Sequence, residues 1–208
     1  MSYELPMFPL GLVAVPGQII PLHIFEPRYR ALIEHCVERA DTAEGPTFGI
    51  VLIRQGSEVG GGDVRHDVGT STRIVKLGRY PDGRFALETL GTHRVVVRQW
   101  YGDDPYPRAL IDDLDEEPWP DDAALAHSIV AATAKLRRVL AMAAEAGHDV
   151  GPATFDVPSD HVAASYVLAA RAPLATPDHQ RLLAAGGPVD RVAWLVGMLD
   201  GWEATLAL

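Results

Sequence analysis

Three groups of side chains in this 208-residue sequence have types and spacings that could support chemistry. In the first group, Asp63, His66 and Asp67 follow a run of glycines and offer the carboxylate and imidazole groups that bind metal ions. A glycine-rich loop has high conformational entropy and does not hold ligands in a converging arrangement, so solvated loop charges are the favoured interpretation. The sequence therefore predicts no metal site and no cofactor.

The other two groups are nucleophile candidates. Cys36 lies near His35 and His23, but it falls on the apolar face of a predicted helix, where a free cysteine behaves as a small buried hydrophobe. Ser128 and Lys135 are two helical turns apart, which is too far for the amine to activate the hydroxyl. No catalytic residue is predicted from either group.

Composition excludes several classes of function. The formal net charge is -10, which opposes binding to a phosphate backbone, so we expect no nucleic-acid partner. A single cysteine excludes an internal disulfide and indicates a reducing compartment, for which we expect the cytoplasm. Prolines and Glu4 interrupt the apolar start, which is not typical of a signal peptide, and no apolar run reaches the roughly 20 residues of a membrane span.

The first half of the chain is predicted to be rich in strands. Prolines punctuate the extended stretch from Leu5 to Val15 and favour an edge or bulged strand, and Pro16-Gly17 is typical of a turn. A second extended piece covers Ile19–Phe25. Apolar residues at helical spacing then predict a helix over Pro27–Ala40, with Pro27 in its first turn.

Four further strands are predicted from β-branched and aromatic residues. They cover Phe48–Arg54, Thr70–Leu77, Arg84–Leu90 and Arg94–Trp100. Turn residues at Pro81-Asp82-Gly83 and at Gly91-Thr92 predict short hairpins between the last three strands. Between Ser57 and Val68 the run Gly60-Gly61-Gly62-Asp63 is predicted to form a mobile loop.

An acidic, proline-containing stretch, Asp112–Asp122, separates this part from an alanine-rich, helical remainder. We therefore expect a β-rich unit over residues 1–115 and a helical unit over 116–208.

A long helix with an apolar face should end near Gly147, and Ser159 or Asp160 can cap a second helix. A short third helix is predicted over Asp178–Ala185 and a last one over Asp190–Leu208. The residues of the long helix's face are Leu125, Ile129, Val130, Leu136, Val139 and Leu140. The last helix has a wide apolar face that predicts packing inside the molecule, with a homodimer as the alternative.

Within the first unit, three runs resemble the N-terminal, substrate-binding domain of Lon proteases. They are Phe8–Gly11, Pro16-Gly17 and the run PLHIFEPRYR from Pro21 to Arg30. The resemblance is strongest over residues 5 to 110. It implies an α+β fold in which a PUA-like pseudo-barrel precedes a helical bundle, and a role in engaging unfolded or tagged polypeptides.

The catalytic parts of Lon are not found in this sequence. No G-x-x-x-x-G-K-[ST] phosphate loop occurs, so ATP hydrolysis is not expected. Lon cleaves peptide bonds with a serine–lysine pair in a separate domain, and neither Lys76 nor Lys135 lies in a similar segment. We expect a non-catalytic adaptor or holdase for unfolded or extended polypeptide, with a Lon-like ATPase or protease as a further partner.

Two sets of residues are predicted to matter for this role. Phe8, Leu10, Ile19, Ile20, Phe25 and Tyr29 are candidates for polypeptide binding, although their alternation does not distinguish a groove from a core. Pro16, Gly17, Glu26, Pro27 and Arg28 form a structural signature that shapes the turn and the helix start.

Two alternative functions remain open at this point. An RNA-binding protein of PUA-like fold would need a contiguous arginine stripe, made of Arg65, Arg73, Arg84, Arg94 and Arg98. A small-molecule enzyme would need a deep pocket with converging polar groups.

Overall fold

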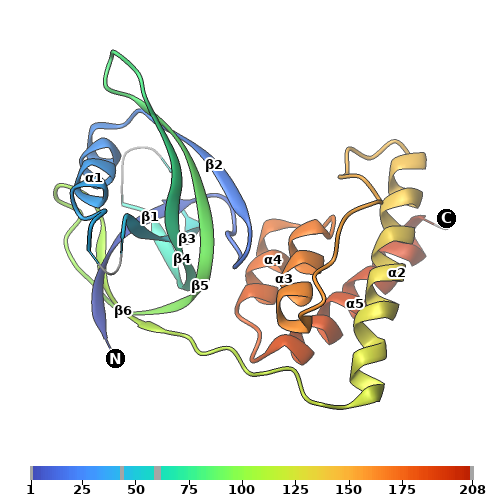
Figure 1. Cartoon of the computed structure of the whole chain (residues 1–208). Helices are drawn as coiled ribbons and strands as arrows, with labels where there is room; N and C mark the ends of the chain where they lie inside the picture. Colours follow the sequence, from blue (N-terminus) through green and yellow to red (C-terminus); the bar gives the residue numbers. More distant parts are fainter. Residues whose placement is uncertain (1, 43–44, 59–61, 207–208) are drawn as a thin grey trace. The chain divides into compact units, whose positions relative to one another are not determined.

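The structure, a computed structural model, describes residues 2–42, 45–58 and 62–206 (Figure 1). The chain forms two compact units, Met1–Asp115 and Glu116–Leu208. Among the described residues, the first unit contains the whole six-stranded sheet and one helix, and the second contains only helices. This arrangement confirms the predicted α+β class, with strands first and helices second. In the described part of the chain, no helix is long and apolar enough to cross a membrane.

Six strands and helix α1 make up the first unit. Their bounds are β1 Tyr3–Leu10, β2 Ile19–Ile24, α1 Pro27–Glu38, β3 Thr47–Gln55, β4 Val64–Arg79, β5 Phe85–Trp100 and β6 Arg108–Asp113. The strand order is β2-β5-β4-β3-β1-β6, and β6 also pairs with β5. This second pairing closes β1, β3, β4, β5 and β6 into a barrel, while β2 extends the sheet beside the first half of β5.

Strand β1 lies between β3 and β6 in the sheet, so it is not the edge or bulged strand that its prolines indicated, although each half of it pairs on one side only. Tyr3–Pro6 pair with β6, and Met7–Leu10 pair in parallel with β3. The Met7 N–H donates to the Pro107 carbonyl, just before β6 (2.8 Å). Backbone groups alternate in direction along a strand, so the nitrogen of Pro9 points to the same side, beyond the part of β1 that pairs with β6. The nitrogen of Pro6 points to the opposite side, before the paired part of β3 begins. Each proline therefore occupies a position where a missing donor breaks no ladder hydrogen bond.

Strand β5 is continuous, so the predicted hairpin at Gly91-Thr92 is also wrong. Ser71 pairs with His93 and Thr72 with Gly91, which leaves Thr92 as the extra residue of a β-bulge. A Cβ on Gly91 would lie 2.3 Å from the carbonyl oxygen of Val15. Glycine is thus needed at position 91 so that the segment before β2 can approach β5 closely. The bulge bends β5, so that its second half belongs to the barrel and its first half to the extension beside β2.

The strand predicted at Thr70–Leu77 is longer in the structure, because β4 begins at Val64. The Gly60-Gly61 part of the predicted mobile loop lies outside the described residues.

Helix α1 covers the concave face of the extended sheet. Its buried residues are Tyr29, Leu32, Ile33 and Cys36. They pack in one cluster with the inward side chains of β2 and β5, including Ile20 and Leu87. A smaller cluster, with Met7 and Val95 among its members, fills the barrel itself.

In the described part of the second unit, the chain forms four helices. Their bounds are α2 Ala123–Glu145, α3 His161–Arg171, α4 Thr176–Leu183 and α5 Pro188–Leu206. The Asp160 carboxylate caps α3 by accepting from the Ala163 N–H (2.7 Å), and Gly147 adopts φ 86° just after α2, as predicted for both positions. Val130 is 67% exposed, so its placement on the buried face of α2 is wrong. The face of α5 that was considered for a homodimer is buried by the unit's own helices, with Leu195 and Leu199 fully covered.

A buried arginine organises this helical unit. The Arg191 side chain is fully buried and donates to Glu116 Oε1 (2.9 Å), Ser165 Oγ (2.7 Å) and the Leu182 carbonyl (3.2 Å). Its guanidinium also lies 3.8 Å from the ring centroid of Tyr166, whose hydroxyl donates to Glu116. These bonds hold the start of the unit against α3, α4 and α5, and they satisfy a charge that would otherwise be costly to bury.

We expect Arg191→Ala to lower the free energy of unfolding of the helical unit by about 3 kcal/mol, because Glu116 would lose its ionic partner in a partly buried site. Urea titration followed by far-ultraviolet circular dichroism measures this change. Arg181→Ala is the matched control, since Arg181 is exposed and stacks on Trp194, and it should change stability by less than about 1 kcal/mol. Equal effects of the two substitutions would contradict the assigned role of Arg191.

Candidate functional site

The free edge of β2 is the first candidate site. Among the described residues, β2 pairs only with β5. The Gly91 N–H donates to the Gln18 carbonyl (2.9 Å), and this bond shows which residues of β2 direct their backbone groups toward β5. Alternation along the strand points the N–H and C=O groups of Ile19 and His23, and the carbonyl of Pro21, away from β5. Open strand edges of this kind can pair with another extended chain.

A second open edge, along the last part of β4, differs in its charges. Beyond Ile74 this strand pairs only with β5, and the exposed hydrophobic side chains Val75, Leu77 and Tyr80 lie along it. However, Lys76 and Arg79 occupy the same edge, and each forms an exposed ion pair. Charged side chains discourage strand addition, whereas β2 has the sequence IIPLHI and contains no Lys, Arg, Asp or Glu. The β2 edge is therefore the better docking edge.

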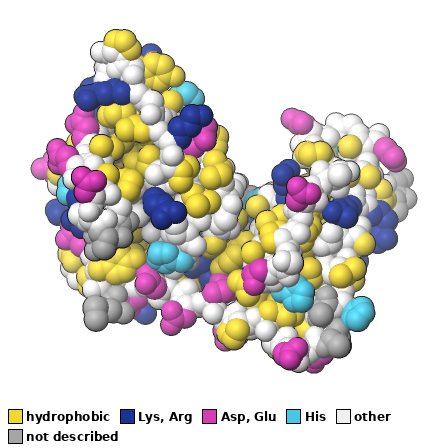
Figure 2. All heavy atoms as spheres, in the orientation of Figure 1, with side chains coloured by type: hydrophobic (Ala, Val, Ile, Leu, Met, Phe, Trp, Pro, Cys, Tyr) yellow, Lys and Arg dark blue, Asp and Glu magenta, His cyan; other side chains and the backbone are white. Residues whose placement is uncertain are grey.

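The structure divides the six residues predicted to bind polypeptide. Phe8, Leu10, Ile20 and Tyr29 are buried in the core cluster around α1, so they are not available to a ligand. Ile19 is 49% exposed and Phe25 is 58% exposed, at the two ends of β2. Figure 2 shows hydrophobic side chains emerging among charged ones over the visible face of the β unit. We call Ile19, Phe25 and the outward backbone groups between them the β2 surface.

The signature residues have structural contacts. Gly17 adopts φ 81° in the predicted turn, and its N–H donates to the Gly91 carbonyl (2.9 Å). Pro27 begins α1, directly after Glu26. Arg28 pairs with Glu26 (3.1 Å) and donates through Nη2 to the Glu58 carbonyl (2.8 Å), so it fastens the helix start to the segment after β3.

A buried ion pair lies next to this signature. The Asp63 side chain is only 1% exposed and accepts from Arg65 Nε (2.6 Å), so its prediction as a solvated loop charge is wrong. Arg65 also binds Asp103 (2.6 Å) and stacks on the ring of Trp100. Burial alone would raise the pKa of the Asp63 carboxyl, but the hydrogen bond and charge of Arg65 outweigh burial and lower that pKa below its ordinary range. No group of three or more potential metal ligands exists among the described residues.

The lowered pKa of Asp63 predicts a pH-dependent contribution to stability. Its ionised form stabilises the fold at pH values above the ordinary aspartate pKa of about 4, and this contribution is lost as the pH falls through the lower pKa of the folded state. Wild type should exceed Asp63→Asn in free energy of unfolding at pH 7, and the difference should shrink as the pH falls from about 5 to 3. Urea titrations at several pH values test this. A difference that grows on acidification would overturn the assignment.

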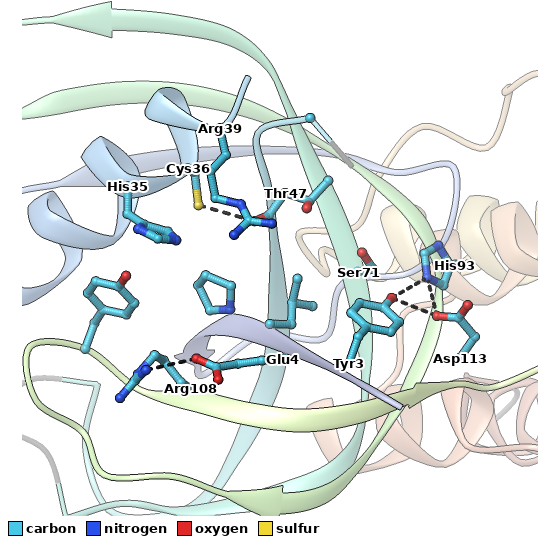
Figure 3. Close-up of a pocket in the computed structure, with 14 residues that line it drawn as sticks. Tyr3, Glu4, His35, Cys36, Arg39, Thr47, Ser71, His93, Arg108 and Asp113 are labelled. Carbon is cyan, nitrogen blue, oxygen red and sulfur yellow. Dashed lines mark hydrogen bonds and ion pairs between the residues drawn. The ribbon is translucent and has the colours of Figure 1, made fainter. Parts of the chain in front are cut away.

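The second candidate site is a cavity of about 790 Å³ at one end of the barrel (Figure 3). Its walls come from β1, β3, β4, β5, β6, the end of α1 and the segment before β6. Glu4 pairs with Arg108 (2.9 Å) on one wall, and His35 and Arg39 enter from α1 on another. The sequence did not reveal this cavity, because its residues are as far apart as Tyr3 and Asp113 and belong to no motif.

A hydrogen-bond network ties together the strands at the far wall of the cavity. Asp113 Oδ1 accepts from the Tyr3 hydroxyl (2.8 Å) and lies 2.9 Å from His93 Nε2, while His93 Nδ1 lies 3.0 Å from Thr92 Oγ1. The Thr92 hydroxyl donates to the Ser71 carbonyl (2.9 Å), so its proton is already engaged. His93 and Asp113 are also about half exposed, where water screens them. The network therefore fastens β1, β4, β5 and β6 to one another and gives no support to the enzyme alternative.

Cys36 lines the same cavity, but its surroundings disfavour the thiolate that a nucleophile would need. It is buried, as predicted, and its Sγ donates to the Thr47 carbonyl (3.2 Å). Burial raises the pKa of its thiol to about 12, and the nearby charge of Arg39 opposes this only in part.

We expect iodoacetamide at pH 8 to leave Cys36 unmodified in the folded protein, because almost none of the thiol is ionised at that pH. The same reagent should label Cys36 completely in urea, where the thiol regains its ordinary pKa. Intact-mass spectrometry reads both reactions. Rapid labelling of the folded protein would show that the thiol is activated.

Two other predicted groups do not come together in the structure. Ser128 donates to the Leu125 carbonyl (2.6 Å), and Lys135 pairs with Asp200 and Glu203, so no serine–lysine pair forms. Of the five arginines considered for RNA binding, Arg94 is buried and Arg65, Arg84 and Arg98 each pair with aspartate, while Arg73 is exposed. These positions do not form the contiguous basic surface that phosphate binding requires.

Comparisons with known proteins agree on one family. The model of the ATP-dependent protease La (LON) substrate-binding domain matches residues 4–201. The Lon protease of Flavobacterium johnsoniae is 29% identical over 124 residues, and that of Anaeromyxobacter dehalogenans is 30% identical over 121 residues. These matches cover 59% and 57% of this chain but only 14% of each relative, so the chain corresponds to a small part of those proteins.

Solved structures support the same assignment of fold. A Lon N-terminal domain protein from Xanthomonas campestris is 26% identical and superposes with a TM-score of 0.64 over 94% of this chain and 98% of that one. The N-terminal domain of a Mycobacterium avium complex Lon protease superposes with a TM-score of 0.65 over 95% of this chain and 98% of that one. Its identity is 14%, so this second match concerns the fold alone.

Proposed function

The chain belongs to the LON substrate-binding domain family, and from this premise we propose that it is a non-catalytic module that holds unfolded or extended polypeptide. The family is defined by a substrate-binding domain, and the Lon proteases that this chain matches align with it over only 14% of their own length. No phosphate loop for ATP occurs in the sequence. Binding without bond cleavage is the function that fits these observations best.

The observation that carries this proposal is the β2 surface. It combines outward backbone donors and acceptors with two large exposed apolar side chains, Ile19 and Phe25. An extended client pairs with the backbone groups, and its side chains contact Ile19 and Phe25. Main-chain hydrogen bonds do not depend on the client's sequence, so this mode of binding suits clients that share only an unfolded state.

The expected affinity is modest. β2 is six residues long, and Pro21 removes one donor from its edge, so few new hydrogen bonds form. Each contributes about 0.5–1.5 kcal/mol, and ordering a flexible client offsets part of the total. From this balance we expect a weak complex, with a dissociation constant in the micromolar range or above.

Such an affinity suits an adaptor or holdase, and the single cysteine supports a reducing compartment such as the cytoplasm. A micromolar complex dissociates readily, so the client can be passed on, and a Lon-like ATPase or protease is the natural recipient. Co-precipitation with that protease, with and without a client, distinguishes the adaptor from a free-standing holdase.

We expect the double substitution Ile19→Ser with Phe25→Ser to weaken the binding of unfolded polypeptide about tenfold or more. Each change removes apolar contact worth about 1 kcal/mol, while the core cluster is left intact. Fluorescence anisotropy of a labelled, reduced and carboxymethylated lactalbumin gives the dissociation constant for both proteins.

Val130→Ser is the matched control, since Val130 is also a large exposed apolar residue but lies on α2. It should bind the labelled client as wild type does. The proposal fails if wild type shows no saturable binding up to high micromolar concentration, or if the double variant binds as tightly as the control.

A further inference from the structure

The cavity at one end of the barrel, here called the barrel-end cavity, is lined by hydroxyl groups that the fold itself does not use. Ser71 is 3% exposed and Tyr106 is 6% exposed, yet neither hydroxyl has a hydrogen-bond partner among the described residues. Neither oxygen is sealed in the core, so both open onto the cavity. By contrast, the hydroxyl of neighbouring Thr72 donates to the Phe48 carbonyl (2.9 Å). Buried hydroxyls normally have partners, so those of Ser71 and Tyr106 are available to a guest.

The backbone of Glu4 adds one donor and one acceptor to the same cavity. The Met7 N–H donates to the Pro107 carbonyl, so alternation turns the N–H and C=O of Glu4 away from β6. On that side β3 pairs with β1 only from Met7 onward, and the Thr47 N–H already donates to the Gly45 carbonyl (2.9 Å). Because Glu4 lines the cavity, its N–H and C=O face the cavity side by side.

The acids and arginines that line the cavity already have partners. Glu4 pairs with Arg108 (2.9 Å), and Asp113 lies 2.9 Å from His93. Arg39 also has an interaction of its own. A charged ligand would lose its hydration here without gaining a free counter-ion. A neutral ligand with hydrogen-bonding groups therefore suits this cavity better than an ion.

A carboxamide group complements this lining. Its carbonyl oxygen accepts two hydrogen bonds and its NH2 group donates two. The carbonyl and one N–H lie side by side on one edge of the planar group, so together they can bond the N–H and the C=O of Glu4. The other lone pair and the other N–H are left for Ser71 and Tyr106, since a hydroxyl both donates and accepts. Glu4 and Ser71 approach the cavity from different strands, β1 and β4 (Figure 3).

We propose that the barrel-end cavity binds a small neutral ligand through a carboxamide group, held by the backbone of Glu4 and the hydroxyls of Ser71 and Tyr106. The volume of about 790 Å³ lies within the range of sites for small ligands, and Leu5 and Pro6 supply apolar surface for the rest of the molecule. Free small molecules and the glutamine side chains of polypeptides both carry this group. The site is separate from the β2 surface and does not rest on the function proposed for it.

Titration of the ¹⁵N-labelled full chain with benzamide, followed by two-dimensional NMR, tests this proposal. We expect saturable shifts, with the Glu4 amide proton moving downfield because its N–H gains an acceptor. Benzoate and N,N-dimethylbenzamide should each bind about tenfold more weakly than benzamide, because the first adds a charge and the second has no N–H to donate.

The double substitution Ser71→Ala with Tyr106→Phe removes both available hydroxyls. We expect it to weaken benzamide binding about tenfold and to leave the urea midpoint close to that of wild type, because neither hydroxyl has a partner in the described fold. Thr72→Val is the matched control. It removes a hydroxyl that the fold does use, so it should lower the urea midpoint and leave benzamide binding unchanged.

The peptide acetyl-Ala-Ala-Gln-Ala-Ala methylamide separates the two sources of the carboxamide, with Leu in place of Gln as its control. A Gln peptide that binds more tightly than both benzamide and the Leu peptide assigns the site to a polypeptide side chain. A Gln peptide that binds more weakly than benzamide assigns it to a free small molecule. The proposal is overturned if benzamide shows no saturable binding at millimolar concentration, if benzamide, benzoate and N,N-dimethylbenzamide bind equally, or if the double variant binds benzamide as wild type does.

Discussion

The pairing of β6 with two strands at once is the constraint on which the rest of the β unit depends. β6 bonds to β1 on one side and to the second half of β5 on the other, and this closes the barrel. Since β5 is long, its first half extends beyond the closed part and needs a separate neighbour, which β2 provides. The extension, the concave face that α1 covers and the open edge of β2 all follow from this closure.

Local features of the fold could be predicted from the sequence because they depend on neighbouring residues. The turn at Pro16-Gly17, the start of α1 at Pro27 and the cap at Asp160 each have a local physical cause. Pairing partners are not local. Pro6 and Pro9 indicated an edge strand, yet β1 changes partner between them and needs neither donor. Gly91 indicated a turn, although its real role is to let the segment at Val15 approach β5.

The candidate sites were predictable only in part for the same reason. Ile19 and Ile20 are neighbours of identical type, and the sequence does not say which of them faces α1. That choice is made by the register of β2 on β5, which buries Ile20 and leaves Ile19 exposed. The barrel-end cavity was out of reach altogether, since it is bounded by the two ends of the β unit and by α1. Its side chains become neighbours only when β6 closes the barrel.

Pro21 has a consequence for self-assembly as well as for ligands. It lies in the middle of the free edge of β2, at the position whose nitrogen faces solvent. If two copies met edge to edge in antiparallel fashion about this residue, the central pair would contribute no donor from either chain, and the joined ladder would be interrupted at its centre. An edge of this kind can accept a short guest strand but is poorly suited to edge-to-edge growth, because each joined ladder would be interrupted at Pro21.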